Sequence, residues 1–222
     1  MKIRHHPEDA LLLAHAAGQL PTGPALVVAS HLESCPRCRE RVREYEALGG
    51  ALLEAASPAA LAPDALARAL AAIDATPGTS APLPQAASAA PRRPALPPGT
   101  PWPAALEGCS ATGWRWMGPG MYWSRVTVPQ DPAAKLFLLR IGAGKRLPTH
   151  THSDLEMTQV LYGRFDDGRA SFGAGDFDSA AGDIHHQPVV AEDGMCICLA
   201  SVDGRLLFDG VIARTIGGLV GM

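Results

Sequence analysis

Residues 30–38 read SHLESCPRC, and this stretch decides how the start of the chain folds, since three potential metal ligands fall within it. His31 precedes Cys35 by four residues, which is about one helical turn. Cys35 and Cys38 have the C-x2-C spacing with which two thiolates bind one ion at a tight turn. Pro36 suits the first position of a helix, so Cys35 is expected at its N-cap, where backbone N–H groups stabilise a thiolate.

The nature of this cluster depends on a fourth ligand. A structural zinc ion takes four protein ligands, so the three residues leave one position to fill. The neighbouring pair His5 and His6 offers two candidates for it. A redox dithiol is the alternative, but such pairs usually lie in a βαβ setting, whereas the sequence flanking Cys35 is typical of helices. We therefore favour structural zinc.

Bulk composition narrows the class of protein. The chain has 222 residues, 47% of them hydrophobic, and a net charge of −3, which argues against a general nucleic-acid-binding protein. Its five cysteines and the absence of a recognisable signal segment do not favour a secreted disulfide framework. No uncharged apolar run reaches the ~18 residues of a membrane span. We expect a cytoplasmic protein without direct contact to nucleic acid or membrane.

Residues 1–76 predict a small four-helix domain. Proline and glycine signals, together with apolar residues at helical spacing, favour helices beginning near Pro7, Thr22, Pro36 and Pro63. Four short helices give a small core, which zinc would supplement by linking the first three. The apolar residues Leu11, Leu12, Leu48 and Leu52 could belong to this core or to an exposed protein-binding face.

Two further segments follow, and the whole is predicted to be a multi-domain α + β chain. Residues 77–101 are rich in proline, alanine and serine, which is typical of a linker. Residues 102–222 contain the β-like runs KLFLLRIG (135–142), MTQVLYGRF (157–165) and MCICLASV (195–202), separated by glycine and aspartate turns. Several short strands without intervening helices favour a β-barrel or sandwich.

The β-rich segment contains a second set of metal-binding residue types. His150 and His152 are two residues apart, so on a strand they share a face, and Glu156 follows them. Further along, His185 or His186 offers another imidazole; adjacent strand residues face opposite ways, and we prefer His186. Such a set can bind zinc, iron, manganese or nickel. Cys196 and Cys198 also share a face, and we expect them to be small buried apolar residues.

These residues resemble a known family motif. The spacing G-x5-H-x-H-x3-E-x6-G matches the first cupin motif at five positions, which are Gly144, His150, His152, Glu156 and Gly163. The second cupin motif is degraded here: Gly182-x2-His185 fits part of it, and His186-x-Pro188 fits another alignment. The resemblance implies a cupin-like jelly-roll barrel over residues 102–222.

Nearly the whole chain resembles the ChrR-type zinc-binding anti-sigma factors. That family joins a helical domain with an H-x3-C-x2-C motif to a cupin-like domain. The resemblance implies that His6, His31, Cys35 and Cys38 bind zinc. It further implies that the helical domain sequesters an extracytoplasmic-function sigma factor from RNA polymerase, and that the cupin domain is needed for its release under singlet oxygen or organic peroxide.

Two competing interpretations remain. In the first, the chain is a cupin dioxygenase or isomerase in which His150, His152, Glu156 and His186 bind Fe²⁺, with the helical domain as an accessory. In the second, it is a redox or metal sensor that does not bind sigma. The combination of both motifs in one chain favours the anti-sigma factor, which is not an enzyme.

Overall fold

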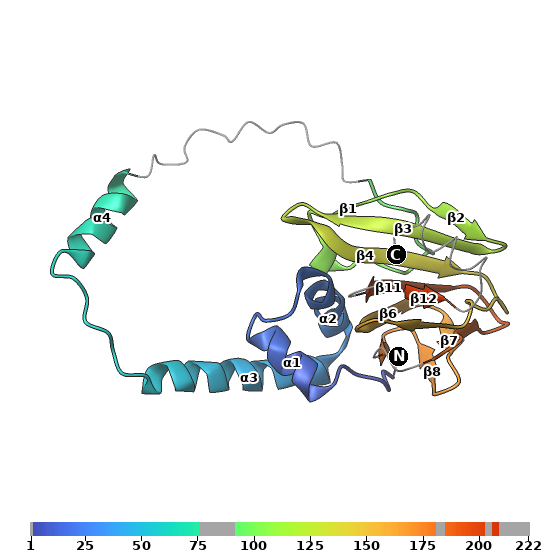
Figure 1. The fold of residues 1–222 in the computed structure, drawn as a ribbon, viewed down its shortest axis with the longest axis horizontal. Helices are drawn as coiled ribbons and strands as arrows, with labels where there is room; N and C mark the ends of the chain where they lie inside the picture. The colour runs from blue at the N-terminus through green and yellow to red at the C-terminus, as the bar shows by residue number, and fades with distance from the viewer. Residues whose placement is uncertain (1, 76–91, 181–184, 203–205, 209–222) are drawn as a thin grey trace.

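The computed structural model describes residues 2–75, 92–180, 185–202 and 206–208. Four α-helices come first, and they are α1 (Asp9–Ala16), α2 (Thr22–Ser34), α3 (Pro36–Ala55) and α4 (Ala65–Ala75). The short 3-10 helix η1 (Ala104–Leu106) precedes a series of strands that form a barrel (Figure 1). The predicted combination of N-terminal helices and a C-terminal cupin-like β-barrel is confirmed.

The described strands form one large antiparallel sheet and two small ones. The large sheet has the order β1 (Ser110–Ala111), β3 (Met121–Val128), β4 (Asp131–Ile141), β11 (Cys196–Val202), β6 (Glu156–Tyr162) and β9 (Phe177–Ala180), with β2 (Arg115–Gly118) paired to β3. The small sheets pair β7 (Arg164–Asp166) with β8 (Ser171–Gly173) and β10 (Val189–Val190), and β5 (His150–His152) with β12 (Leu206–Phe208).

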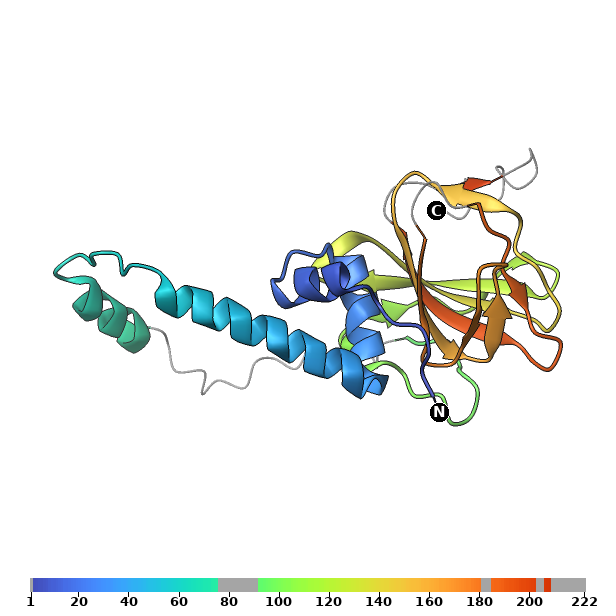
Figure 2. The ribbon, with the colours of Figure 1, turned by 90° about the horizontal axis from the view of Figure 1, so that it is seen from below.

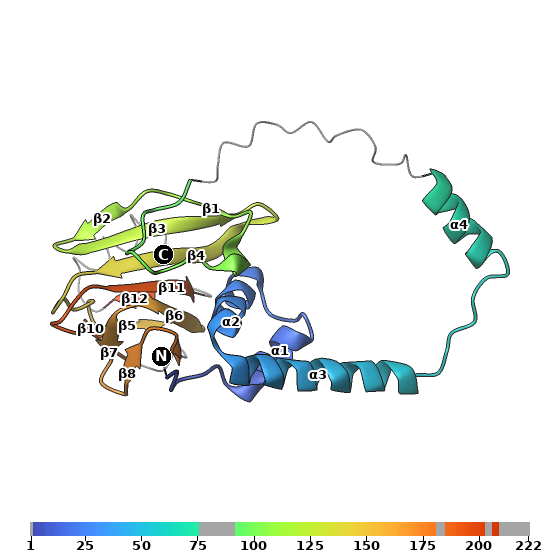
Figure 3. The same cartoon turned by 180° about the vertical axis from the view of Figure 1, so that it is seen from behind.

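Both faces of the large sheet are covered, which β6 illustrates. Because side chains alternate along a strand, Glu156 and Thr158 line a cavity inside the barrel, whereas Met157 joins the core on the outer face. Gln159 also lies on the outer face, where it contacts His31 of α2. The large sheet is therefore a layer between the helices on one side and the barrel interior on the other (Figure 3).

The first three helices have no core of their own. Helix α2 packs on β4, β6 and β11, and its buried residues belong to the same apolar cluster as the outer face of the sheet. Buried members of this cluster come from the helices (Leu12, Val27, Val28, Cys35, Cys38, Val42), from η1 (Leu106) and from the barrel (Val126, Leu136, Leu138, Met157, Phe177, Leu199). The predicted small helical core is in fact an extension of the barrel's core.

The fourth helix does not join that core, which corrects the prediction of a four-helix core. Helix α3 projects away from the barrel, and α4 lies near its far end (Figure 2). None of the residues of α4 is buried, and its apolar residues Leu66, Leu70 and Ile73 are exposed. The residues between α3 and α4 are themselves exposed, so no packing draws α4 back. Among the described helices, none is both long and apolar enough to cross a membrane.

Gly163 gives a test of the barrel geometry. It has a φ of +73°, and a Cβ there would meet the carbonyl oxygen of Met195. We expect Gly163→Ala to lower the free energy of unfolding by about 2–5 kcal/mol, because left-handed backbone strain adds to a backbone clash. Chemical denaturation of the purified chain measures the loss.

Gly168→Ala is the matched control. Gly168 has a φ of +86°, but nothing lies within 4 Å of a Cβ at that position. Only the backbone strain of about 1–2 kcal/mol should then appear. Equal losses for the two variants would contradict the close approach of Gly163 to Met195.

Candidate metal centres

The first centre lies where the N-terminal segment, α2 and α3 meet. His6, His31, Cys35 and Cys38 each offer a ligand atom, and these four atoms lie within 4.8 Å of one another. His6 Nδ1 is 3.3 Å from Cys35 Sγ and 3.4 Å from Cys38 Sγ. Zinc bonds of about 2.0–2.3 Å in a tetrahedron separate the ligand atoms by roughly 3.3–3.8 Å. The observed nitrogen–sulfur spacing therefore fits a single zinc ion.

Cys35 brings the two sulfurs together because it ends one helix and begins the next. Its N–H donates to the carbonyl of His31, which closes α2, and its sulfur accepts from the N–H of Cys38 at 3.5 Å, which caps α3. Pro36 occupies the first turn of α3, and Cys35 has an extended φ of −110°. The predicted N-cap position of Cys35 is confirmed.

The barrel determines which of the two N-terminal histidines faces the sulfurs. The N–H groups of Arg4 and His5 donate to Asp176 Oδ1 at 2.6 and 3.0 Å, and the N–H of Phe177 donates to the carbonyl of His5. This pairing with the start of β9 turns the His5 ring to Phe172, with ring centroids 4.5 Å apart. His6 then points to the opposite side, toward Cys35 and Cys38.

Burial disfavours the charged forms of His31 and Cys38 when no metal is bound. Burial lowers the pKa of His31 to about 4, so the ring is neutral at pH 7, the form that binds metal. Its Nε2 is buried and has no hydrogen-bond partner. Burial, together with the neighbouring Cys35 sulfur, raises the pKa of Cys38 to about 12. A dication would supply the positive charge that a buried thiolate pair requires.

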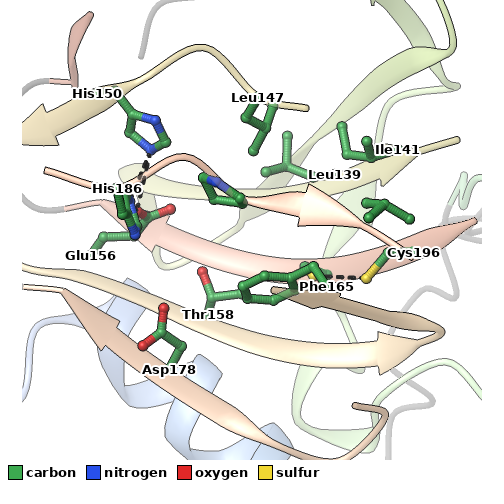
Figure 4. Close-up of a pocket in the computed structure, with 13 residues that line it drawn as sticks. Leu139, Ile141, Leu147, His150, Glu156, Thr158, Phe165, Asp178, His186 and Cys196 are labelled. Carbon is green, nitrogen blue, oxygen red and sulfur yellow. Dashed lines mark hydrogen bonds and ion pairs between the residues drawn. The ribbon is translucent and has the colours of Figure 1, made fainter. Parts of the chain in front are cut away.

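The second centre lies inside the barrel. His150 Nε2 is 3.2 Å from His186 Nε2, and these two nitrogens lie 3.8 and 3.6 Å from Glu156 Oε2. His150 Nδ1 donates to the carbonyl of Pro148 at 2.8 Å, so its Nε2 keeps a lone pair toward the cluster. The three residues come from β5, from the start of β6 and from the segment before β10, and they are buried (Figure 4).

Of the other histidines considered for this centre, the structure describes the side chain of His185 but not that of His152. His185, the alternative to His186, is exposed, whereas His186 is buried, and its backbone forms an isolated antiparallel β-bridge with that of His150. The backbone of His152 belongs to β5, but its side chain lies outside the described part of the structure. Among the described side chains, the cluster thus contains three of the four residues predicted for it.

A layer of charged residues behind His186 was not predicted. Asp167 Oδ2 lies 3.6 Å from His186 Nδ1, and Arg169 donates to both Asp167 and Asp178. Although burial opposes it, the nearby carboxylates of Asp167 and Glu156 raise the pKa of His186 to about 9. The carboxylates that hold a proton on His186 would equally attract a metal ion. In the sequence Asp167 belongs to the polar turn DDGR and Asp178 to the short strand FDSA, so neither residue stood out, and only the fold brings them to His186.

The cavity around the second centre is small. Its volume is about 40 Å³, enough for two or three water molecules by the usual measure of about 10–15 Å³ each. Cys196 and Cys198 line its apolar end, with their sulfurs 3.6 Å apart. Both thiols are free and buried, as predicted for small apolar residues. Drug-sized ligands occupy pockets of roughly 300–1,000 Å³, so this cavity suits only an ion and a ligand of a few atoms.

Comparison with known proteins gives matches to both parts of the chain. The family model of the ChrR cupin-like domain matches residues 105–203, and a zinc-finger family model matches residues 9–39. The second match covers His31, Cys35 and Cys38, and it supports zinc in the N-terminal region.

Two relatives match over nearly the full length. The anti-sigma-E factor ChrR of Cereibacter sphaeroides is 41% identical over 97% of this chain and 97% of its own length. A crystal structure of Rhodobacter sphaeroides SigE in complex with the anti-sigma ChrR matches with a TM-score of 0.69 and 35% identity. That match covers 91% of this chain and 100% of the matched chain.

Proposed function

The chain belongs to the ChrR family of anti-sigma factors, and we propose that it binds an extracytoplasmic-function sigma factor and keeps it from RNA polymerase. One observation carries the proposal: 41% identity to the Cereibacter sphaeroides ChrR extends over 97% of both chains. A match of that extent includes the helical and the barrel parts together, in the same order. The family is one of regulatory proteins that bind a partner, not of enzymes.

We propose that His6, His31, Cys35 and Cys38 bind a structural zinc ion. The support is the 3.3 and 3.4 Å spacing between His6 Nδ1 and the two sulfurs, and the buried Nε2 of His31. Zinc would add a cross-link between the N-terminal segment, α2 and α3, which holds the start of α3 in a fixed direction. Structural zinc sites contribute directly to folding in this way.

The proposed sigma-binding surface comprises the exposed apolar residues of α3 and α4. On α3 these are Leu48, Leu52 and Leu53, and on α4 they are Leu66, Leu70 and Ile73. Leu12, by contrast, is buried in the shared core. The spacing of four residues between Leu48 and Leu52, and between Leu66 and Leu70, gives each helix an apolar stripe that suits a protein partner.

We expect the full chain, co-expressed with the sigma factor encoded in its own genome, to form a one-to-one complex that contains zinc. Changing both Cys35 and Cys38 to serine should remove the metal held by the thiolates and with it the complex, because α3 is then no longer tied to the N-terminal segment. Size-exclusion chromatography with metal analysis measures both quantities.

Cys109→Ser is the matched control for that experiment, because Cys109 is also buried and free but lies outside the cluster. The Cys109→Ser variant should still bind both the metal ion and the sigma factor. A zinc-loaded, folded wild-type chain that binds no sigma factor of its genome would contradict the proposal.

The apolar stripes give a separate prediction. Leu52→Asp and Leu70→Asp should each weaken sigma binding by about 30-fold, since an interface anchor is typically worth about 2 kcal/mol. Calorimetric titration of purified sigma factor measures the change. Trp116→Asp on β2 is the control, because Trp116 is 67% exposed and Leu52 is 66% exposed. Equal affinities for all three variants would place the sigma-binding surface elsewhere.

We further propose that the barrel binds zinc or another divalent metal such as iron, manganese or nickel, through His150, His152, Glu156 and His186. In this proposal the barrel is needed for sigma release under oxidative stress caused by singlet oxygen or organic peroxide. The cavity of about 40 Å³ supports a signal of molecular-oxygen or peroxide size rather than a metabolic substrate. Since sigma factors act on RNA polymerase, the proposed location is the cytoplasm.

The neighbours His185 and His186 test the role of the barrel. In cells exposed to singlet oxygen or an organic hydroperoxide, His186→Gln should suppress transcription from a promoter that depends on the partner sigma, because sigma stays bound. His185→Gln should respond like the wild type, because His185 is exposed whereas His186 is buried. Normal induction in the His186→Gln strain would exclude the barrel centre from the response.

A further inference from the structure

His31 is in contact with the barrel as well as with its own helix. It is fully buried on α2, and its Nδ1 lies 3.1 Å from Gln159 Oε1 and 3.0 Å from the carbonyl oxygen of Gly175. Gln159 belongs to β6 of the large sheet, and Gly175 lies in the turn that connects β8 to β9, so both acceptors come from the barrel. They are 128 and 144 residues away from His31 in the sequence.

These two contacts determine the tautomer of His31. A backbone carbonyl only accepts hydrogen bonds, so Nδ1 carries the proton toward Gly175, and the Gln159 oxygen shares it. Nε2 then has a lone pair, and it is this buried nitrogen that has no hydrogen-bond partner. A hydrogen bond from the second ring nitrogen to an oxygen is the usual arrangement that orients a metal-binding histidine and raises its basicity.

The other histidine of the cluster is also held by the barrel. The residues before His6 pair with Asp176 and Phe177, at the start of β9. Phe177 also packs against the His31 ring, with centroids 5.7 Å apart. The two nitrogen ligands of the cluster are thus positioned by the barrel, whereas the two sulfur ligands are positioned by the junction of α2 and α3.

We infer that Gln159 is a positioning residue for the zinc ligand His31, and that through it the barrel sets the metal affinity of the helical centre. This inference rests on the proposed zinc site. Gln159 touches no metal itself; it acts by fixing the ring orientation and the tautomer of His31. The metal affinity of the helical part is therefore coupled to its contacts with β6 and β9.

Cobalt(II) titration of the metal-free full chain tests the inference. Absorption from thiolate-to-cobalt charge transfer reports the centre that contains Cys35 and Cys38, and it should be lost when both are changed to serine. Gln159→Met keeps the length of the side chain but removes the acceptor. It should weaken cobalt binding about tenfold, at the lower end of the range for such partners because Gly175 still accepts.

Three further variants make the result specific. Met157→Leu changes a neighbouring residue on the same face of β6 and should leave the cobalt affinity unchanged. Gln159→Glu keeps an acceptor oxygen of the same reach and should restore affinity relative to Gln159→Met. Gln159→Asn keeps an amide but shortens its reach, so it should weaken binding; it decides the question if Gln159→Met does not fold, which circular dichroism detects.

Wild-type affinity in the folded Gln159→Met and Gln159→Asn variants would overturn the inference. A wild-type chain without a thiolate-to-cobalt band would instead overturn the proposed zinc site. The two failures are therefore distinguishable in one set of titrations.

Discussion

The central strands of the large sheet are buried on both faces, and the segments that cover these two faces organise the rest of the molecule. The small sheets cover the inner face around the cavity, and α2 covers the outer face with Val27 and Val28. All seven residues of β11 are buried as a result. Since α2 is fixed by this packing, the residues at its C-terminal end, His31 and Cys35, are fixed with respect to the barrel.

Local sequence patterns predicted the features that depend on local geometry. The CPRC run specified Cys35 as the cap of α3 because proline, helix start and sulfur lie within four residues. The runs KLFLLRIG and MCICLASV have apolar residues at both odd and even positions, which is a strand covered on both sides. This pattern indicates that both faces of the strands are buried, but it does not indicate that a helix from the N-terminal part covers one of them.

Contacts between distant segments could not be predicted in this way. Gln159 reads as one polar residue in a β-like run, and only the seating of α2 on β6 makes it a partner of His31. Asp167 and Asp178 likewise come together with Arg169 only because β7, β8 and β9 lie close in the barrel. For α4 the apolar spacing predicted the helix correctly, but spacing alone does not tell whether the stripe faces the same chain or another protein.

The alternation of side chains along β6 has a thermodynamic consequence. Glu156 faces the barrel cavity and Gln159 faces His31, so one rigid strand connects the two candidate centres. Binding equilibria connected in this way form a closed cycle, in which the coupling free energy is the same in both directions. If an occupant of the barrel lowers the metal affinity of the helices by some factor, metal at the helices must lower the affinity of the barrel for that occupant by the same factor. A protein partner that prefers the metal-loaded helices enters the same cycle, and its binding would increase the affinity of the helices for the ion.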